Sequence, residues 1–126
     1  MNNNNPNILI VDDSSTNNLL LESALSDKGL NIITAVDGKK ALDIFSKKRI
    51  DLVLLDIMMP GLSGYDVLEL MLKETKLASI PVIMVTARSQ VEDMEKAKKM
   101  GAVDYFEKPL NLDKLISRVK ELVKNN

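Results

Sequence analysis

The chain has 126 residues, of which 45% are apolar, and it contains no cysteine and no histidine. This length suits a single domain with one hydrophobic core. The net charge of −1 lacks the basic excess that is typical of proteins that bind nucleic acid or anionic membranes. The missing residue types exclude Cys/His zinc sites, thiol nucleophiles and Ser-His-Asp triads. Any chemistry must therefore use carboxylates, hydroxyls, lysines and backbone groups.

The N-terminal segment, residues 1–6, has neither a basic start nor an apolar core, which excludes a signal peptide. The longest apolar runs have four residues, whereas a membrane span needs about 20. We therefore expect residues 1–6 to be a disordered tail and residues 7–124 to form one soluble, cytoplasmic domain.

Five short runs rich in Ile, Val and Leu, each bounded by polar or turn residues, predict buried strands. They start near residues 8, 32, 52, 82 and 102. The runs at 8–11, 52–55 and 82–85 are wholly apolar, as expected of strands in a parallel sheet that is covered on both faces.

Apolar residues at helical spacing lie between these runs. The positions are Leu21, Ala24 and Leu25, then Ala41, Leu42 and Phe45, then Val67, Leu68, Met71 and Leu72, then Val91, Met94 and Ala97, and finally Leu112, Leu115, Ile116, Val119, Leu122 and Val123. A serine three residues before an acid, at Ser63 and at Ser89, predicts two helix starts. Gly29 and Gly101 stand where the first and fourth helices are expected to stop.

Five alternating strand–helix units favour an open α/β sheet over a barrel, which needs eight. The predicted fold is a flavodoxin-like, doubly wound (βα)5 domain. Its five parallel strands would lie in the order 2-1-3-4-5 with helices on both faces.

Polar residues follow four of the predicted strands. Asp12 and Asp13 end the first strand, Asp56 the third and Thr86 the fourth, and Lys108 follows the fifth. In doubly wound sheets, ligands bind outside the carboxyl ends of the strands, where the strand order switches. We therefore expect these side chains to converge in one polar site.

Three carboxylates and one ammonium sum to −2, a charge that a divalent cation would offset. Oxygen ligands with an open side suit Mg²⁺, which keeps several waters and shares its shell with a phosphate. A carboxylate in such a site can attack phosphorus and form an aspartyl phosphate. Lys108 and Thr86 would then contact the phosphoryl oxygens, where positioning and charge stabilisation supply most of the catalysis.

Four segments carry these strand-end residues. They are I-L-I-V-D-D at 8–13, L-L-D-I-M-M-P-G at 54–61, V-T-A at 85–87 and G-A-V-D-Y-F-E-K-P-L at 101–110. Together and in this order, they resemble the receiver domain of two-component response regulators, the CheY-like family, over about residues 7 to 124.

The resemblance implies that Asp56 is the phosphoacceptor and that the cofactor is Mg²⁺. Asp13 matches the direct metal ligand, and Asp12 matches its partner, which often acts through water. Asp56 itself and the main-chain carbonyl of Met58 would complete the protein's share of the metal site.

The resemblance also implies roles for three later residues. Lys108 matches the lysine that pairs with the phosphate, and its bond to Pro109 is expected to be cis. Thr86 matches the switch hydroxyl, and Tyr105 matches the aromatic that changes rotamer on activation.

A receiver domain is not an enzyme for other substrates, since it catalyses only its own phosphorylation and dephosphorylation. The resemblance implies that the phosphoryl group comes from a sensor histidine kinase or a histidine phosphotransfer protein. The signal would reach a downstream protein through the surface of the fourth helix, fifth strand and fifth helix. No direct contact with nucleic acid or membrane is implied.

Several alternatives stay open. Asp13 and Ser14 could merely cap the start of the first helix, but Asp56, Thr86 and Lys108 would then be coincidences. A haloacid-dehalogenase-type phosphatase also uses a strand-end Asp and Mg²⁺, yet it needs a D-x-D motif and a longer fold. An inert receiver is disfavoured because Asp56, Thr86 and Lys108 are all present. The chain could also be a receiver excised from a larger regulator or hybrid histidine kinase.

Overall fold

The predicted strands form one parallel sheet in the computed structural model, which describes residues 5–88 and 90–124. They are β1 (Asn7–Val11), β2 (Asn31–Ala35), β3 (Leu52–Leu55), β4 (Val82–Thr86) and β5 (Asp104–Glu107). The order β2-β1-β3-β4-β5 confirms the predicted doubly wound topology. β1, β3 and β4 are the inner strands, which is why their runs are wholly apolar, whereas the edge strands β2 and β5 are mostly half-buried.

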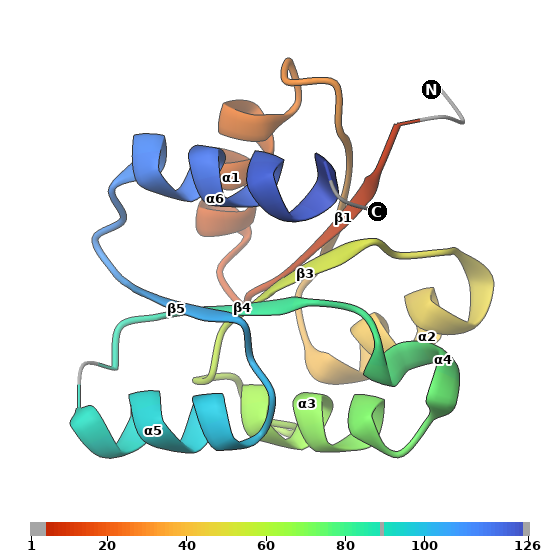
Figure 1. Cartoon of the computed structure of the whole chain (residues 1–126), viewed down its shortest axis with the longest axis vertical. Helices are drawn as coiled ribbons and strands as arrows, with labels where there is room; N and C mark the ends of the chain where they lie inside the picture. The colour runs from red at the N-terminus through yellow and green to blue at the C-terminus, as the bar shows by residue number, and fades with distance from the viewer. Residues whose placement is uncertain (1–4, 89, 125–126) are drawn as a thin grey trace.

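Helices cover both faces of the sheet (Figure 1). They are α1 (Ser15–Leu25), α2 (Gly38–Lys47), α3 (Gly64–Leu72), α4 (Thr75–Ala78), α5 (Val91–Lys99) and α6 (Leu112–Lys124). α1 and α6 lie on one face, and α2, α3 and α5 lie on the other (Figure 1). The strand residues alternate between these layers, so that Ile8 and Ile10 pack with α1 and α6 while Leu9 and Val11 face the opposite helices. The short helix α4 was not predicted, and the predicted fourth and fifth helices are therefore α5 and α6.

One of the two predicted capping motifs is confirmed. The Ser63 hydroxyl accepts from the Asp66 N–H, and the Asp66 carboxylate accepts from the Ser63 N–H, so a full capping box begins α3. Ser89 lies outside the described residues. The residue that caps α5 is Gln90, and its side chain makes no capping hydrogen bond.

Two predicted boundaries shift by a few residues. Gly101 lies directly after the C-cap of α5 with a φ of 98°, as expected, but α1 ends at Leu25, well before Gly29. The fifth strand begins at Asp104 rather than near 102, because the Ala102 N–H is still bonded back to a carbonyl of α5.

The predicted apolar stripe of α5 is largely wrong. Val91 is 63% exposed and Met94 is 38% exposed, while the buried residues of this helix are Asp93 and Ala97. The helix is turned toward Asp93 because the carboxylate of that residue has partners on neighbouring segments, Tyr65 and Arg88 among them.

The predicted tail is described only from Asn5. The carbonyls of Asn5 and Pro6 accept hydrogen bonds from Asn31, so backbone contacts begin before β1. Residues 1–4 lie outside the described residues. In the described ranges, none of the helices combines the length and the apolar character that crossing a membrane requires.

Candidate functional site

Three carboxylates converge at the carboxyl ends of β1 and β3. These strands are neighbours in the sheet, and the Asp56 N–H donates to the Val11 carbonyl. Asp12 and Asp56 are 3% and 5% exposed, and Asp13 lies at the exposed rim. One oxygen from each of the three carboxylates lies within 4.8 Å of the others. The predicted acid cluster is therefore present.

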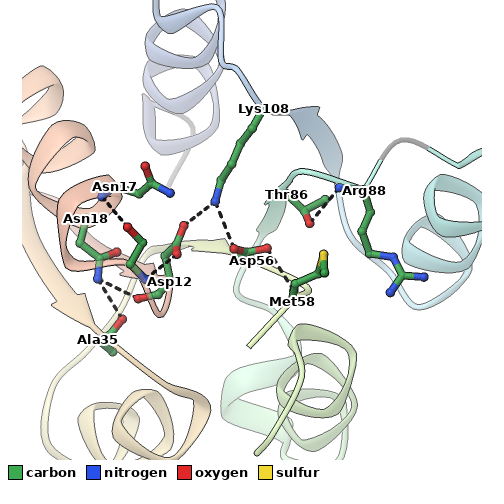
Figure 2. A network of polar contacts seen from close by, with 10 residues as sticks. Asp12, Asn17, Asn18, Ala35, Asp56, Met58, Thr86, Arg88 and Lys108 are labelled. Atoms are coloured by element: carbon green, nitrogen blue, oxygen red, sulfur yellow. Dashed lines mark hydrogen bonds and ion pairs between the residues drawn. The ribbon is translucent and has the colours of Figure 1, made fainter. Parts of the chain in front are cut away.

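Lys108 joins two of these acids from the loop after β5 (Figure 2). Its ammonium lies 2.6 Å from Asp12 and 3.1 Å from Asp56. The Lys108 N–H donates to the Thr86 carbonyl, and the bond to Pro109 is cis, as predicted. Burial opposes the charge of Lys108, but the hydrogen bonds to the two carboxylates outweigh this effect and raise the pKa of the ammonium above its ordinary value.

Backbone N–H groups hold the other oxygens of the two buried acids. Asp12 Oδ1 accepts from the Ser14 N–H at 2.9 Å, and Asp56 Oδ1 accepts from the Met58 N–H at 3.1 Å. The Met58 side chain is exposed, so this residue faces the site through its main chain. Both buried carboxylates are thus fixed at two points.

The two predicted switch residues, Thr86 and Tyr105, both form hydrogen bonds with the main chain of Arg88. The fully buried Thr86 hydroxyl accepts from the Arg88 N–H at 3.4 Å (Figure 2). The Tyr105 hydroxyl donates to the Arg88 carbonyl at 2.8 Å. Thr86 and Tyr105 are therefore linked through the main chain of one residue.

Sequence reasoning missed a polar cluster beside this link. The Asp93 carboxylate accepts from the Tyr65 hydroxyl at 2.8 Å and from Arg88 Nε at 3.1 Å, and the Lys96 ammonium lies 4.1 Å from the centre of the Tyr65 ring. The hydrogen bond from Tyr65 keeps the pKa of Asp93 below its ordinary range, against the effect of burial. The sequence carried no signal for this cluster, because Asp93 lies outside the predicted apolar stripe of Val91, Met94 and Ala97.

The donor set fits a hard divalent cation. Within the described residues, the cluster offers carboxylate oxygens and carries a net charge of −2 when Lys108 is included. An open hollow of about 700 Å³ adjoins it, with Asp13 and Met58 in its lining. Oxygen ligands with an open side suit Mg²⁺, which retains waters and shares its shell with phosphate oxygens.

Curated relatives share much of this sequence. The chain is 37% identical to Sporulation initiation phosphotransferase F of Bacillus subtilis, over 93% of each protein. It is 40% identical to the "Probable transcriptional regulator ycf27" of Cyanophora paradoxa, over 96% of this chain and 49% of that protein. The chain spans about half the length of the ycf27 and ycf29 proteins that it matches.

Solved structures and a family model agree with these relatives. The receiver domain of the Francisella response regulator 1452 matches with a TM-score of 0.88 and 32% identity, over 96% of this chain and 98% of that one. The family model of the response regulator receiver domain matches residues 8–120. Because this match covers most of the chain, the protein belongs to the response regulator receiver domain family.

Proposed function

We propose that this receiver domain accepts a phosphoryl group on Asp56 in a Mg²⁺-dependent reaction. The observation that carries the proposal is the buried Asp56 carboxylate, paired with Lys108 and facing two further acids. The donor would be a sensor histidine kinase or a histidine phosphotransfer protein. The similarity to a protein named a phosphotransferase, over nearly the whole of both chains, supports this class of partner.

Asp12, Asp13, Asp56 and the main-chain carbonyl of Met58 would hold the metal ion. When bound, Mg²⁺ supplies positive charge that offsets the acid cluster and the oxygens of the incoming phosphoryl group. Asp13 is the acid best placed for direct contact, because Asp12 is already engaged by Lys108 and by the Ser14 N–H.

In the reaction, a carboxylate oxygen of Asp56 attacks phosphorus. A bond from that oxygen to phosphorus forms, and the bond from phosphorus to the donor nitrogen breaks, leaving the donor histidine neutral once it has taken up a proton. The Lys108 ammonium then pairs with a phosphoryl oxygen. The Thr86 hydroxyl donates to another phosphoryl oxygen and leaves the Arg88 N–H.

Phosphorylation would change the face formed by α5, β5 and α6. Loss of the Thr86–Arg88 contact loosens the main-chain segment that also binds the Tyr105 hydroxyl, so that Tyr105 can change rotamer. A downstream protein would recognise the altered face, in the cytoplasm and without direct contact between this domain and nucleic acid or membrane. Such a device is a two-state element biased by a local charge.

Intact-mass spectrometry tests the proposal. Incubation with acetyl phosphate and Mg²⁺ should add one phosphoryl group to the wild type and to Asp43→Asn, an exposed control on α2, but none to Asp56→Asn. Labelling that persists in Asp56→Asn would place the acceptor elsewhere. A wild type that is never labelled would indicate an inert receiver, and turnover of a generic phosphate ester would indicate a phosphatase.

A further inference from the structure

Asn18 is a buried amide on α1 that the proposed phosphoryl chemistry does not use. It is 4% exposed. Its Nδ2 group donates to the Asp12 carbonyl at 2.9 Å and to the Ala35 carbonyl at 3.3 Å (Figure 2). Its Oδ1 atom has no hydrogen-bond partner in the part of the chain that the structure describes.

The Asn18 amide extends the hydrogen bonding between β1 and β2 beyond their last backbone hydrogen bond. The pairing of these strands ends at Val11 and Ala35, and the Asp12 N–H still donates to the Ala35 carbonyl. The next carbonyl, that of Asp12, has Asn18 as its donor. Because a peptide unit is planar, holding this carbonyl also fixes the orientation of the peptide that leads into Asp13.

The direction of the Asp13 side chain depends on this peptide more than the directions of the Asp12 and Asp56 side chains do. Asp12 and Asp56 each have a backbone donor and Lys108 as partners of their carboxylates. Across residues 5–88 and 90–124, no hydrogen bond or ion pair holds the Asp13 carboxylate. The main chain therefore sets the direction of the Asp13 side chain toward the other two acids.

The unpartnered Oδ1 atom of Asn18 indicates that the N–H donors, and not the oxygen, explain an amide at this position. Burying a polar atom without a partner destabilises the fold, and a leucine, which has the same branching but no polar atom, would avoid this cost. A residue needed only to fill space would thus be apolar at this position. The N–H donors explain why an amide stands there.

We infer that Asn18 is a positioning residue of the metal site, and that its amide orients the Asp12–Asp13 peptide so that Asp13 can bind Mg²⁺. This inference rests on the proposed function, because it assigns Asn18 a role toward the proposed metal ion.

Calorimetric titration with Mg²⁺, without any phosphodonor, tests the inference on the full chain. Asn18→Leu keeps the number and branching of the side-chain heavy atoms and removes the donors. It should weaken Mg²⁺ affinity by about 10- to 100-fold, as loss of residues that orient metal ligands commonly does. Asn18→Ser, which is smaller and less disruptive to the fold, should weaken it in the same direction. Circular dichroism in Mg²⁺-free buffer establishes that each variant is folded.

Asn31→Leu is the matched control, because Asn31 is also a buried amide of the β1–β2 pair, at the opposite end, where it donates to Asn7 and Asn5. It should lower the unfolding temperature but leave Mg²⁺ affinity unchanged.

The outcomes separate the inference from the function on which it rests. A wild type that binds Mg²⁺ together with folded Asn18 variants of unchanged affinity would overturn the inference alone. An equal loss of Mg²⁺ affinity in Asn31→Leu would also overturn it. A wild type that binds no Mg²⁺ would overturn both.

Discussion

At the scale of single residues, Lys108 forms ion pairs with two buried acids, Asp12 and Asp56. It pairs with one oxygen of Asp12 and one of Asp56, while backbone N–H groups hold the remaining oxygens. Buried charges are tolerated when they are paired and hydrogen bonded in this way. Substitution of Asp56 by Asn removes one charge and keeps the Asp12–Lys108 pair, so we expect that variant to fold.

The two acids after β1 should differ in their contribution to metal binding. We expect Asp13→Ala to nearly abolish Mg²⁺ affinity, because the Asp13 carboxylate has no competing partner among the described residues. Asp12→Ala should reduce the affinity less, but it should destabilise the fold more, because it leaves Lys108 with a single carboxylate partner. Calorimetric titration and urea unfolding measure the two effects. Equal losses of affinity would contradict this assignment, and full affinity in the double variant would exclude the site.

The Tyr65–Asp93 pair predicts a response to alkaline pH. Burial, followed by the hydrogen bond to the Asp93 carboxylate, raises the pKa of Tyr65 well above that of a free tyrosine. A phenol that holds its proton more tightly when folded stabilises the fold fully below the unfolded pKa of about 10, and this contribution is lost as the pH rises above that value. Stability should therefore fall more steeply above about pH 10 in the wild type than in Tyr65→Phe.

Absorbance titration of tyrosinate isolates this group. The chain has two tyrosines, so Tyr105→Phe leaves Tyr65 as the only signal. Its midpoint should lie above that of the same variant unfolded in urea, and Asp93→Asn should bring the two midpoints closer. Identical midpoints in the folded and unfolded protein would contradict the prediction.

At the scale of elements, the start of α3 lies directly against the backbone of the candidate phosphoacceptor. The Gly64 N–H donates to the Ile57 carbonyl at 2.9 Å. A Cβ atom on Gly64 would collide with the Asp56 carbonyl and would lie 2.8 Å from the Ile57 Cα. Glycine is thus required here for close approach, and α3 sets the position of the loop that carries Asp56.

Gly64→Ala should therefore impair both the fold and the site. Backbone must move to relieve the collision, which we expect to cost about 1–3 kcal/mol and to slow phosphorylation by acetyl phosphate. Gly29→Ala is the control, because its φ of 76° gives strain of about 1–2 kcal/mol with no atom close to the added Cβ. Urea unfolding and the rate of mass gain measure the two effects. If both variants slow phosphorylation equally, general destabilisation explains the loss.

At the scale of the whole molecule, the site and the proposed output face are connected by a short main-chain path. Thr86 at the end of β4 and Tyr105 on β5 both bind Arg88, whose side chain reaches Asp93 on α5. Under the proposed function, a phosphoryl group on Asp56 would act on this path through the Thr86 hydroxyl, without any large movement of the sheet. The inner strands, buried on both faces, provide the rigid frame for this change.

Structures with and without beryllofluoride, a phosphoryl mimic, test this path. We expect Thr86 to leave the Arg88 N–H and Tyr105 to change rotamer when beryllofluoride and Mg²⁺ are bound, since the mimic offers a charged acceptor to which the Thr86 hydroxyl can donate. Asp56→Asn under the same conditions should keep both contacts. If both rotamers stay unchanged while a partner still distinguishes the two states, the signal takes another route.

Local patterns in the sequence were sufficient for the sheet and for the main residues of the candidate site. Apolar runs predicted the strands, and the five alternating units predicted a parallel sheet, since parallel strands need helical crossovers. The order 2-1-3-4-5 was predicted as the one typical of flavodoxin-like sheets. Strand-end residues converge because parallel strands place their carboxyl ends at one edge of the sheet. Asp12, Asp13, Asp56 and Lys108 were therefore predictable from the chain alone.

Only the tertiary structure decided the contacts that helices make with these strand ends. Asn18 lies on α1 in a polar stretch, yet packing turns its amide toward the Asp12 carbonyl. Val91 and Met94 have helical spacing but face outward, because Asp93 gains partners on α3 and in the loop after β4. Periodicity reports which residues share a face of a helix, but the rotation of that helix depends on partners distant in sequence. Those partners exist only once the chain has folded.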